Sequence, residues 1–229
     1  MSRTYAAVVI TAGLLAAACS GGSTSGTASP VAGSAAPDVA ALTLTAADFP
    51  APYVFAPLPP GAAASASDAL AGATFDPPAC GDAAKAASLG GGKDAGIAVA
   101  TDPASKSSVS ATVSPVTTQL SDLDALATRC ASYTVMLPAT TAGGATARAT
   151  VALLPPPTVD ADGTRALRST TSVNVGGRSS NLVVLSLIAQ LKGLQVSVTG
   201  IPGRSGAPVD PGLLDELLVK AVQKVRAGS

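Results

Sequence analysis

The sequence predicts an α+β domain with an antiparallel β-sheet of about five or six strands, two or three helices packed on one face, and one disulfide. Two observations favour this fold class. From residue 38 to residue 229, short β-like runs are separated by Gly- and Pro-rich turns. A few other stretches carry apolar residues at helical spacing. This mixture of patterns is typical of α+β domains.

The elements predicted first along the chain are short. We expect a turn or short helix over residues 45–48, an extended segment over 53–56 and a loop over 61–72. A helix over 78–89 would begin near Cys80 and end at the glycines of residues 90–92. Strands over 96–101 and 107–114 then form a hairpin.

A second helix is predicted to begin at Ser121. Ser121 would be its N-cap, with Asp124 in the acidic position of a capping box. Leu123, Leu126 and Cys130 recur at helical spacing along one side. Cys130 is therefore expected on the buried stripe of this helix.

Four further strands are predicted over residues 146–154, 165–174, 182–190 and 194–201. A two-residue turn at 192–193 would join the last two. In that register Leu187 faces Val198 on one side of the sheet, and Ser186 faces Thr199 on the other. A three-residue turn would mix apolar with polar partners, so the two-residue turn is preferred.

The second face of this hairpin is a candidate groove, because Val184 and Ile188 interrupt its polar side chains. Two explanations stay open. A loop or the segment Pro155–Pro157 folds across the apolar residues, or the face is a mixed groove for a ligand or partner. The residues of this candidate groove are Val184, Ser186, Ile188, Gln190, Gln195, Ser197 and Thr199.

The last predicted element is a helix with Asp210 as N-cap and Pro211 at its first position, running to Arg226. Its apolar residues form one stripe. We expect this helix to cover the apolar face of the sheet.

The first 37 residues are expected to be an export signal and a tether. Residues 1–18 combine a positive start, an apolar stretch and small residues before Cys19, as in a lipoprotein signal peptide. The segment Leu14–Cys19 resembles a bacterial lipobox, although Leu15 stands one place earlier than usual. Residues 19–37 would be the lipidated cysteine and a disordered Ser/Gly/Ala tether. An ordinary secreted protein cleaved at the same site is the alternative.

The cysteine count agrees with lipidation. If Cys19 carries diacylglycerol and acyl chains such as palmitate, Cys80 and Cys130 remain as an even pair. Disulfides persist in the oxidising space outside the membrane. The chain would thus be anchored to the cell membrane on its extracytoplasmic side.

Composition excludes several classes of function. The chain has no histidine and a formal net charge of zero. It therefore lacks the Ser-His and Cys-His dyads of hydrolases and the basic surface expected of a nucleic-acid partner. With Glu216 as its single glutamate, we predict no catalytic residues, no metal site and no cofactor.

Several motifs resemble those of actinobacterial cell-envelope lipoproteins. These are the segment Ala47–Tyr53, the cysteine of Pro77–Cys80, a second helical cysteine, and the closing strand and helix. The chain also resembles the extracellular sensor domains of mycobacterial kinases of the PknH type, over about Asp38 to Arg226. The resemblance implies an antiparallel α+β domain with a ligand-binding cleft. That kinase group usually has a second disulfide, for which this chain lacks the cysteines.

The function predicted from these observations is a non-catalytic, lipid-anchored binding or sensing module of the cell envelope. Its partner would be an unidentified small molecule or lipid, or an envelope protein. Two alternatives stay open: a scaffold that uses its sheet face to meet another protein, and a hydrolase that works without histidine.

Overall fold

A computed structural model describes residues 38–57, 72–87, 94–137, 145–175, 178–203 and 206–228, which belong to one compact unit, Asp38–Ser229. The predicted signal peptide, Cys19, the predicted tether and the glycines of residues 90–92 lie outside the described residues. Most of the loop predicted over 61–72 lies outside them as well.

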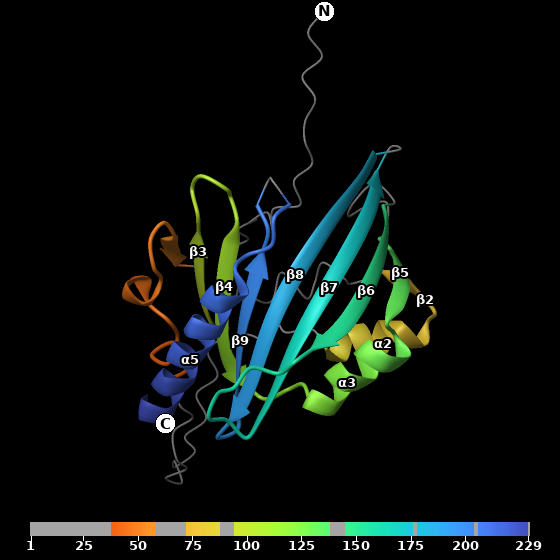
Figure 1. The fold of residues 1–229 in the computed structure, drawn as a ribbon. Helices are drawn as coiled ribbons and strands as arrows, with labels where there is room; N and C mark the ends of the chain where they lie inside the picture. The colour runs from red at the N-terminus through yellow and green to blue at the C-terminus, as the bar shows by residue number, and fades with distance from the viewer. Residues whose placement is uncertain are drawn as a thin grey trace, which may run out of the picture. The chain divides into compact units, whose positions relative to one another are not determined.

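The fold is α+β with an antiparallel nine-stranded sheet, which confirms the predicted class (Figure 1). The strand order is β1-β3-β4-β9-β8-β7-β6-β5-β2, and each neighbouring pair is antiparallel. The strands are β1 (Val54–Pro57), β2 (Thr74–Asp76), β3 (Gly96–Thr101), β4 (Ser108–Pro115), β5 (Ser132–Met136), β6 (Thr146–Leu154), β7 (Gly163–Val175), β8 (Arg178–Leu191) and β9 (Leu194–Ile201).

The predicted strand count was too low. Strands β2 and β5 were not predicted, and β1 was expected only as an extended segment over residues 53–56. These three strands have three to five residues each, too few for a clear alternating pattern. Strands β3, β6 and β9 have the predicted bounds.

The described helical elements are the 3-10 turn η1 (Ala46–Asp48), α2 (Ala79–Ala86), α3 (Leu120–Arg129) and α5 (Pro211–Gly228). Helix α3 begins one residue before the predicted N-cap. Gln119 is its N-cap, and the Asp122 carboxylate accepts a hydrogen bond from the Gln119 backbone N–H. The predicted capping residue Asp124 instead pairs with Arg165.

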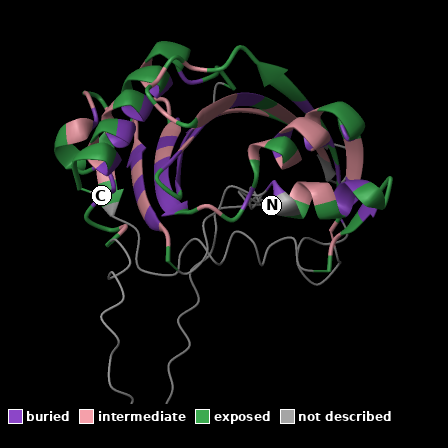
Figure 2. Ribbon diagram, turned by 90° about the horizontal axis from the view of Figure 1, so that it is seen from below, coloured by how far each residue is buried: buried purple, intermediate pink, exposed green. Residues whose placement is uncertain are grey.

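The helices lie on opposite faces of the sheet, which corrects the prediction that they share one face. The sheet is curved, with α2 and α3 on its inner side and α5 on its outer side (Figure 2). Strand β8 shows how this works: Leu187 packs in the α5 core, and its neighbour Ile188 packs beneath α3. Because successive side chains of a strand point to opposite faces, two adjacent apolar residues pack into the cores on the two sides of the sheet.

Helix α5 covers the outer face of β4, β9 and β8, as its apolar stripe predicted. Leu214, Leu217 and Leu218 are completely buried there. Each buried leucine contributes about 1.5 to 3 kcal/mol through apolar surface removed from water. Gly200 on β9 lets the start of α5 approach, because a Cβ at this position would lie 2.9 Å from Val209 Cβ.

The N-terminal end of the described domain is fastened to α5 by lysine side chains. Lys224 Nζ lies 2.8 Å from Asp48 Oδ2 and donates to the Thr43 carbonyl oxygen. Lys220 Nζ donates to the Asp48 carbonyl oxygen. Burial acts to raise the pKa of Asp48, but hydrogen bonds from Lys224 and Thr45 outweigh it and lower that pKa below its usual 3.8.

The hairpin of β8 and β9 has the predicted register. Leu191 pairs with Leu194, Leu187 with Val198, and Ser186 with Thr199. Lys192 and Gly193 form the two-residue turn, with φ of 51° and 73°. Positive φ at both positions is typical of the type I′ turns that join tightly paired strands.

Candidate functional site

A disulfide holds together the two helices on the inner face. Cys80 at the start of α2 and Cys130 at the end of α3 are bonded and buried, as the sequence predicted. They are 50 residues apart in the chain. The pair α2–α3 is therefore one cross-linked layer above the inner face of β5–β8.

Helix α3 covers the apolar part of the predicted groove. Leu123 and Leu126 form a core cluster with Ile188, which has no exposed surface. The prediction that the segment Pro155–Pro157 might cover Ile188 is wrong. Val159, just after that segment, packs against the α5 core on the other face.

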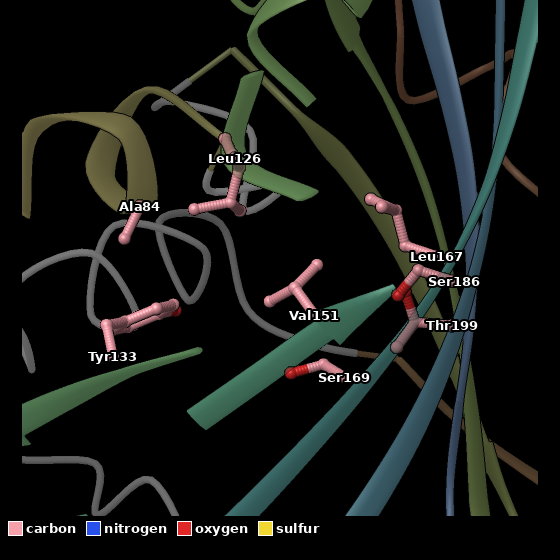
Figure 3. Close-up of a pocket in the computed structure, with 9 residues that line it drawn as sticks. Ala84, Leu126, Tyr133, Val151, Leu167, Ser169, Ser186 and Thr199 are labelled. Atoms are coloured by element: carbon pink, nitrogen blue, oxygen red, sulfur yellow. The ribbon is translucent and has the colours of Figure 1, made fainter. Parts of the chain in front are cut away.

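A pocket of about 270 Å³ lies between the α2–α3 layer and the inner face of the sheet (Figure 3). Ala84, Ala87 and Leu126 contribute from the helices. Val151 and Leu167 contribute apolar side chains from β6 and β7, and Tyr133 contributes its ring from β5. These six residues form the apolar part of the lining.

Besides the phenol of Tyr133, three aliphatic hydroxyl groups form the polar part of the lining. They belong to Ser169, Ser186 and Thr199, which lie on the neighbouring strands β7, β8 and β9. The side-chain oxygens of Ser186 and Thr199 are 3.1 Å apart and share a hydrogen bond. Figure 3 shows these two side chains on the opposite side of the pocket from Tyr133 and Ala84.

The electrostatics of the lining are simple, because none of the lining residues in the described part of the chain is acidic or basic. Burial raises the pKa of the Tyr133 phenol, which keeps it protonated. Arg165 lies on the same face of β7, but its Nε and Nη2 contact the Asp124 carboxylate at 2.6 and 2.7 Å. Those hydrogen bonds outweigh burial and lower the pKa of Asp124.

The structure places the seven predicted groove residues on one sheet face, but it separates them by role. Ser186 and Thr199 line the pocket. Gln190 donates to Gln195 Oε1 and to the Thr118 carbonyl oxygen, so both amides take part in structural hydrogen bonds. Ile188 and Ser197 are buried, and Val184 is half-buried and not among the described lining residues.

Sequence reasoning missed most of the pocket. Tyr133 lies on β5, a strand that was not predicted. Val151 and Ser169 lie on predicted strands, but nothing in the sequence aligns β6 and β7 with the β8–β9 hairpin. The alternation of apolar and hydroxyl-bearing residues along β6 and β7 was the signal in the sequence that could have pointed to these lining residues. The pairings Val151 with Ser169 and Leu167 with Ser186 bring these residues together.

The described residues contain neither a cluster of metal ligands nor a membrane-spanning helix. Within them, no group of three or more His, Cys, Asp or Glu side chains could hold a metal ion. None of the described helices is long and apolar enough to cross a membrane.

The fold and the pocket define this part of the chain as an α+β domain with a disulfide-linked helical layer above its sheet. The chain belongs to the DUF5642 family, described as a domain of unknown function, whose model matches residues 38–226. A comparison with curated proteins gave no match.

Among solved structures, the chain is similar to an uncharacterised protein from Mycobacterium smegmatis, the ortholog of Rv0999. The identity is 17%, and the match covers 83% of this chain and 97% of that chain, with a TM-score of 0.47.

Proposed function

We propose that this protein is a non-catalytic binding module, anchored by lipid outside the cell membrane, that takes a small ligand in the pocket between the α2–α3 layer and the sheet. The observation that carries the proposal is the pocket itself. Apolar side chains with a few placed polar groups are typical of ligand sites, and 270 Å³ is slightly below the usual size of about 300 to 1,000 Å³, which suits a small ligand.

The disulfide supports a location outside the membrane. Disulfides persist in oxidising compartments and are rare in the cytosol. Of the three cysteines in the chain, Cys80 and Cys130 pair with each other, and Cys19 is the one outside this disulfide. A cysteine directly after an export signal is the residue that lipoprotein processing acylates, and the resemblance to envelope sensor domains agrees with this topology.

The pocket favours a binding or sensing role over a scaffold that presents its sheet face. A scaffold face would leave apolar side chains such as Ile188 open to a partner, but α3 buries Ile188 completely. The exposed large apolar residues of the described chain are spread over β1, β5, β6, β8, β9 and α5: Val54, Met136, Leu153, Leu154, Leu182, Ile201 and Val219. Scattered apolar residues of this kind are normal on any protein surface.

The anchor is tested by Cys19→Ala in a related host fed an alkyne fatty acid. The wild-type chain should incorporate the label and sediment with membranes, and the variant should do neither. Equal labelling of both chains would contradict lipidation at Cys19.

The pocket is tested by Ala84→Phe, which places a ring in the space that lies between Ala84 and the sheet. Whole protein purified from the host should release a small molecule from wild type and none from the variant, measured by mass spectrometry of organic extracts. Ala152→Phe on the exposed outer side of β6 is the matched control and should retain the molecule. Equal recovery from Ala84→Phe would contradict this site.

A further inference from the structure

The lining of the pocket disfavours a charged ligand. None of the nine lining residues that the structure describes is acidic or basic, and burial raises the pKa of the Tyr133 phenol. The nearby Arg165 donates its Nε–H and Nη2–H to Asp124 and its Nη1–H to the Thr164 carbonyl oxygen. A charged group bound against this lining would give up part of its hydration without gaining a counter-ion from the described lining residues, which is unfavourable.

The hydroxyl groups of Ser186 and Thr199 lie together at one end of the pocket, on the opposite side from Tyr133. Ser186 and Thr199 together have two O–H hydrogens, and the bond between their oxygens uses one of them. The other hydrogen can be donated to a ligand oxygen, and the oxygen lone pairs can accept a hydrogen bond from a ligand O–H. Ser169 lies diagonally across from Ser186 on β7, at a spacing of about 7 to 8 Å between such sites. This end therefore suits one hydroxyl or carbonyl group.

The remainder of the lining suits hydrocarbon. Leu126, Val151 and Leu167 are each at most 7% exposed, and Ala84 and Ala87 present methyl groups from α2. At about 30 Å³ for a water-sized group, 270 Å³ holds about nine such groups. A ligand with eight carbon atoms and one oxygen atom would therefore fill this volume.

We propose that the pocket binds a small uncharged molecule of about nine non-hydrogen atoms, with its oxygen against Ser186 and Thr199 and its hydrocarbon against Leu126, Val151 and Leu167. This inference rests on the proposed function, since it names the class of ligand that the same pocket takes.

The test uses three probes of one chain length and different charge: 1-octanol, octanoate and octylammonium. Each is titrated into the whole protein at neutral pH and followed by isothermal calorimetry and by NMR shifts of the Tyr133 ring. Octanol should bind at least tenfold more tightly than either charged probe, with the shifts confined to residues of the pocket.

A variant pair tests the placement of the oxygen. Ser186→Ala combined with Thr199→Val keeps the shape of the lining and removes both hydroxyls. It should weaken octanol binding about threefold to tenfold, consistent with a net loss of about one hydrogen bond. Thr170→Val, which removes a hydroxyl from the outer side of β7, is the control and should bind octanol like wild type.

Each outcome decides a different point. Octanoate or octylammonium binding as tightly as octanol would overturn the uncharged class but leave a binding pocket. Failure of all three probes, together with no small molecule released from the host-purified protein, would overturn the proposed function as well. If the double variant does not fold, the three-probe comparison on wild type decides the proposal alone.

Discussion

Breaking the Cys80–Cys130 bond should destabilise the domain by an amount that follows from the length of the loop it closes. The two cysteines are 50 residues apart. In the chain-entropy description, a cross-link of this span lowers the entropy of the unfolded chain and stabilises the folded state by about 4 kcal/mol. Typical domains are stable by only about 5 to 15 kcal/mol, so this is a large share of the total.

The assay compares oxidised wild type, reduced wild type and the variant Cys80→Ala/Cys130→Ala in urea, followed by circular dichroism. Reduction keeps both sulfur atoms and removes only the cross-link, so the free energy of unfolding should fall by about 4 kcal/mol. The double variant also loses buried sulfur contacts and should be about 1 kcal/mol less stable again.

The α2–α3 layer should lose most of its order. Its backbone amides should exchange with solvent faster after reduction, while those of α5 on the other face keep most of their relative protection. A loss of less than about 1 kcal/mol on reduction, or equal loss of protection in α3 and α5, would refute the view that this bond holds the layer in place.

Three further substitutions test the packing and the charges. Ile188→Ala should lower the free energy of unfolding by about 3 to 4 kcal/mol, because Ile188 is fully buried under α3. Val184→Ala should lower it by about 1 kcal/mol, because Val184 is half-buried. Equal losses for the two variants would contradict the finding that α3 covers Ile188. Gly200→Ala should cost about 1 to 3 kcal/mol in urea unfolding, because its Cβ would meet α5; Gly212→Ala, where the nearest atom is 3.5 Å away, is the control. Asp48→Asn should lower stability at neutral pH by about 1 to 2 kcal/mol. Because the folded pKa of Asp48 is lowered, its contribution is present above pH 3.8 and is lost as pH falls further, so thermal unfolding of the variant should depend less on pH in that range.

The sequence predicted much of this fold because several of its signals are local. Alternation of apolar residues is enough to place β3, β6 and β9, and Lys192–Gly193 determines the register of the last hairpin. The capping pattern of α3 was misread by two residues, since Ser121 and Gln119 are both followed by an acidic residue three positions later.

The rest depended on contacts that no local pattern encodes. Leu187 and Ile188 are equally apolar in the sequence, although they point to opposite faces of the sheet. The sequence therefore could not distinguish a sheet with helices on both faces from a sheet with helices on one face and a loop over the other. Likewise, the pocket requires β5, β6 and β7 to align with the β8–β9 hairpin. Ser186 and Thr199 could be paired from the sequence, but Tyr133 could not be placed opposite them.

The most direct test of the central claim is a crystal structure of the whole protein purified from an actinobacterial host without added ligand. We predict density for an uncharged molecule between the Tyr133 ring and the hydroxyls of Ser186 and Thr199, beneath a cross-linked α2–α3 layer. A pocket closed by Leu126 packed directly onto Ser186, with no space for a ligand, would contradict the account.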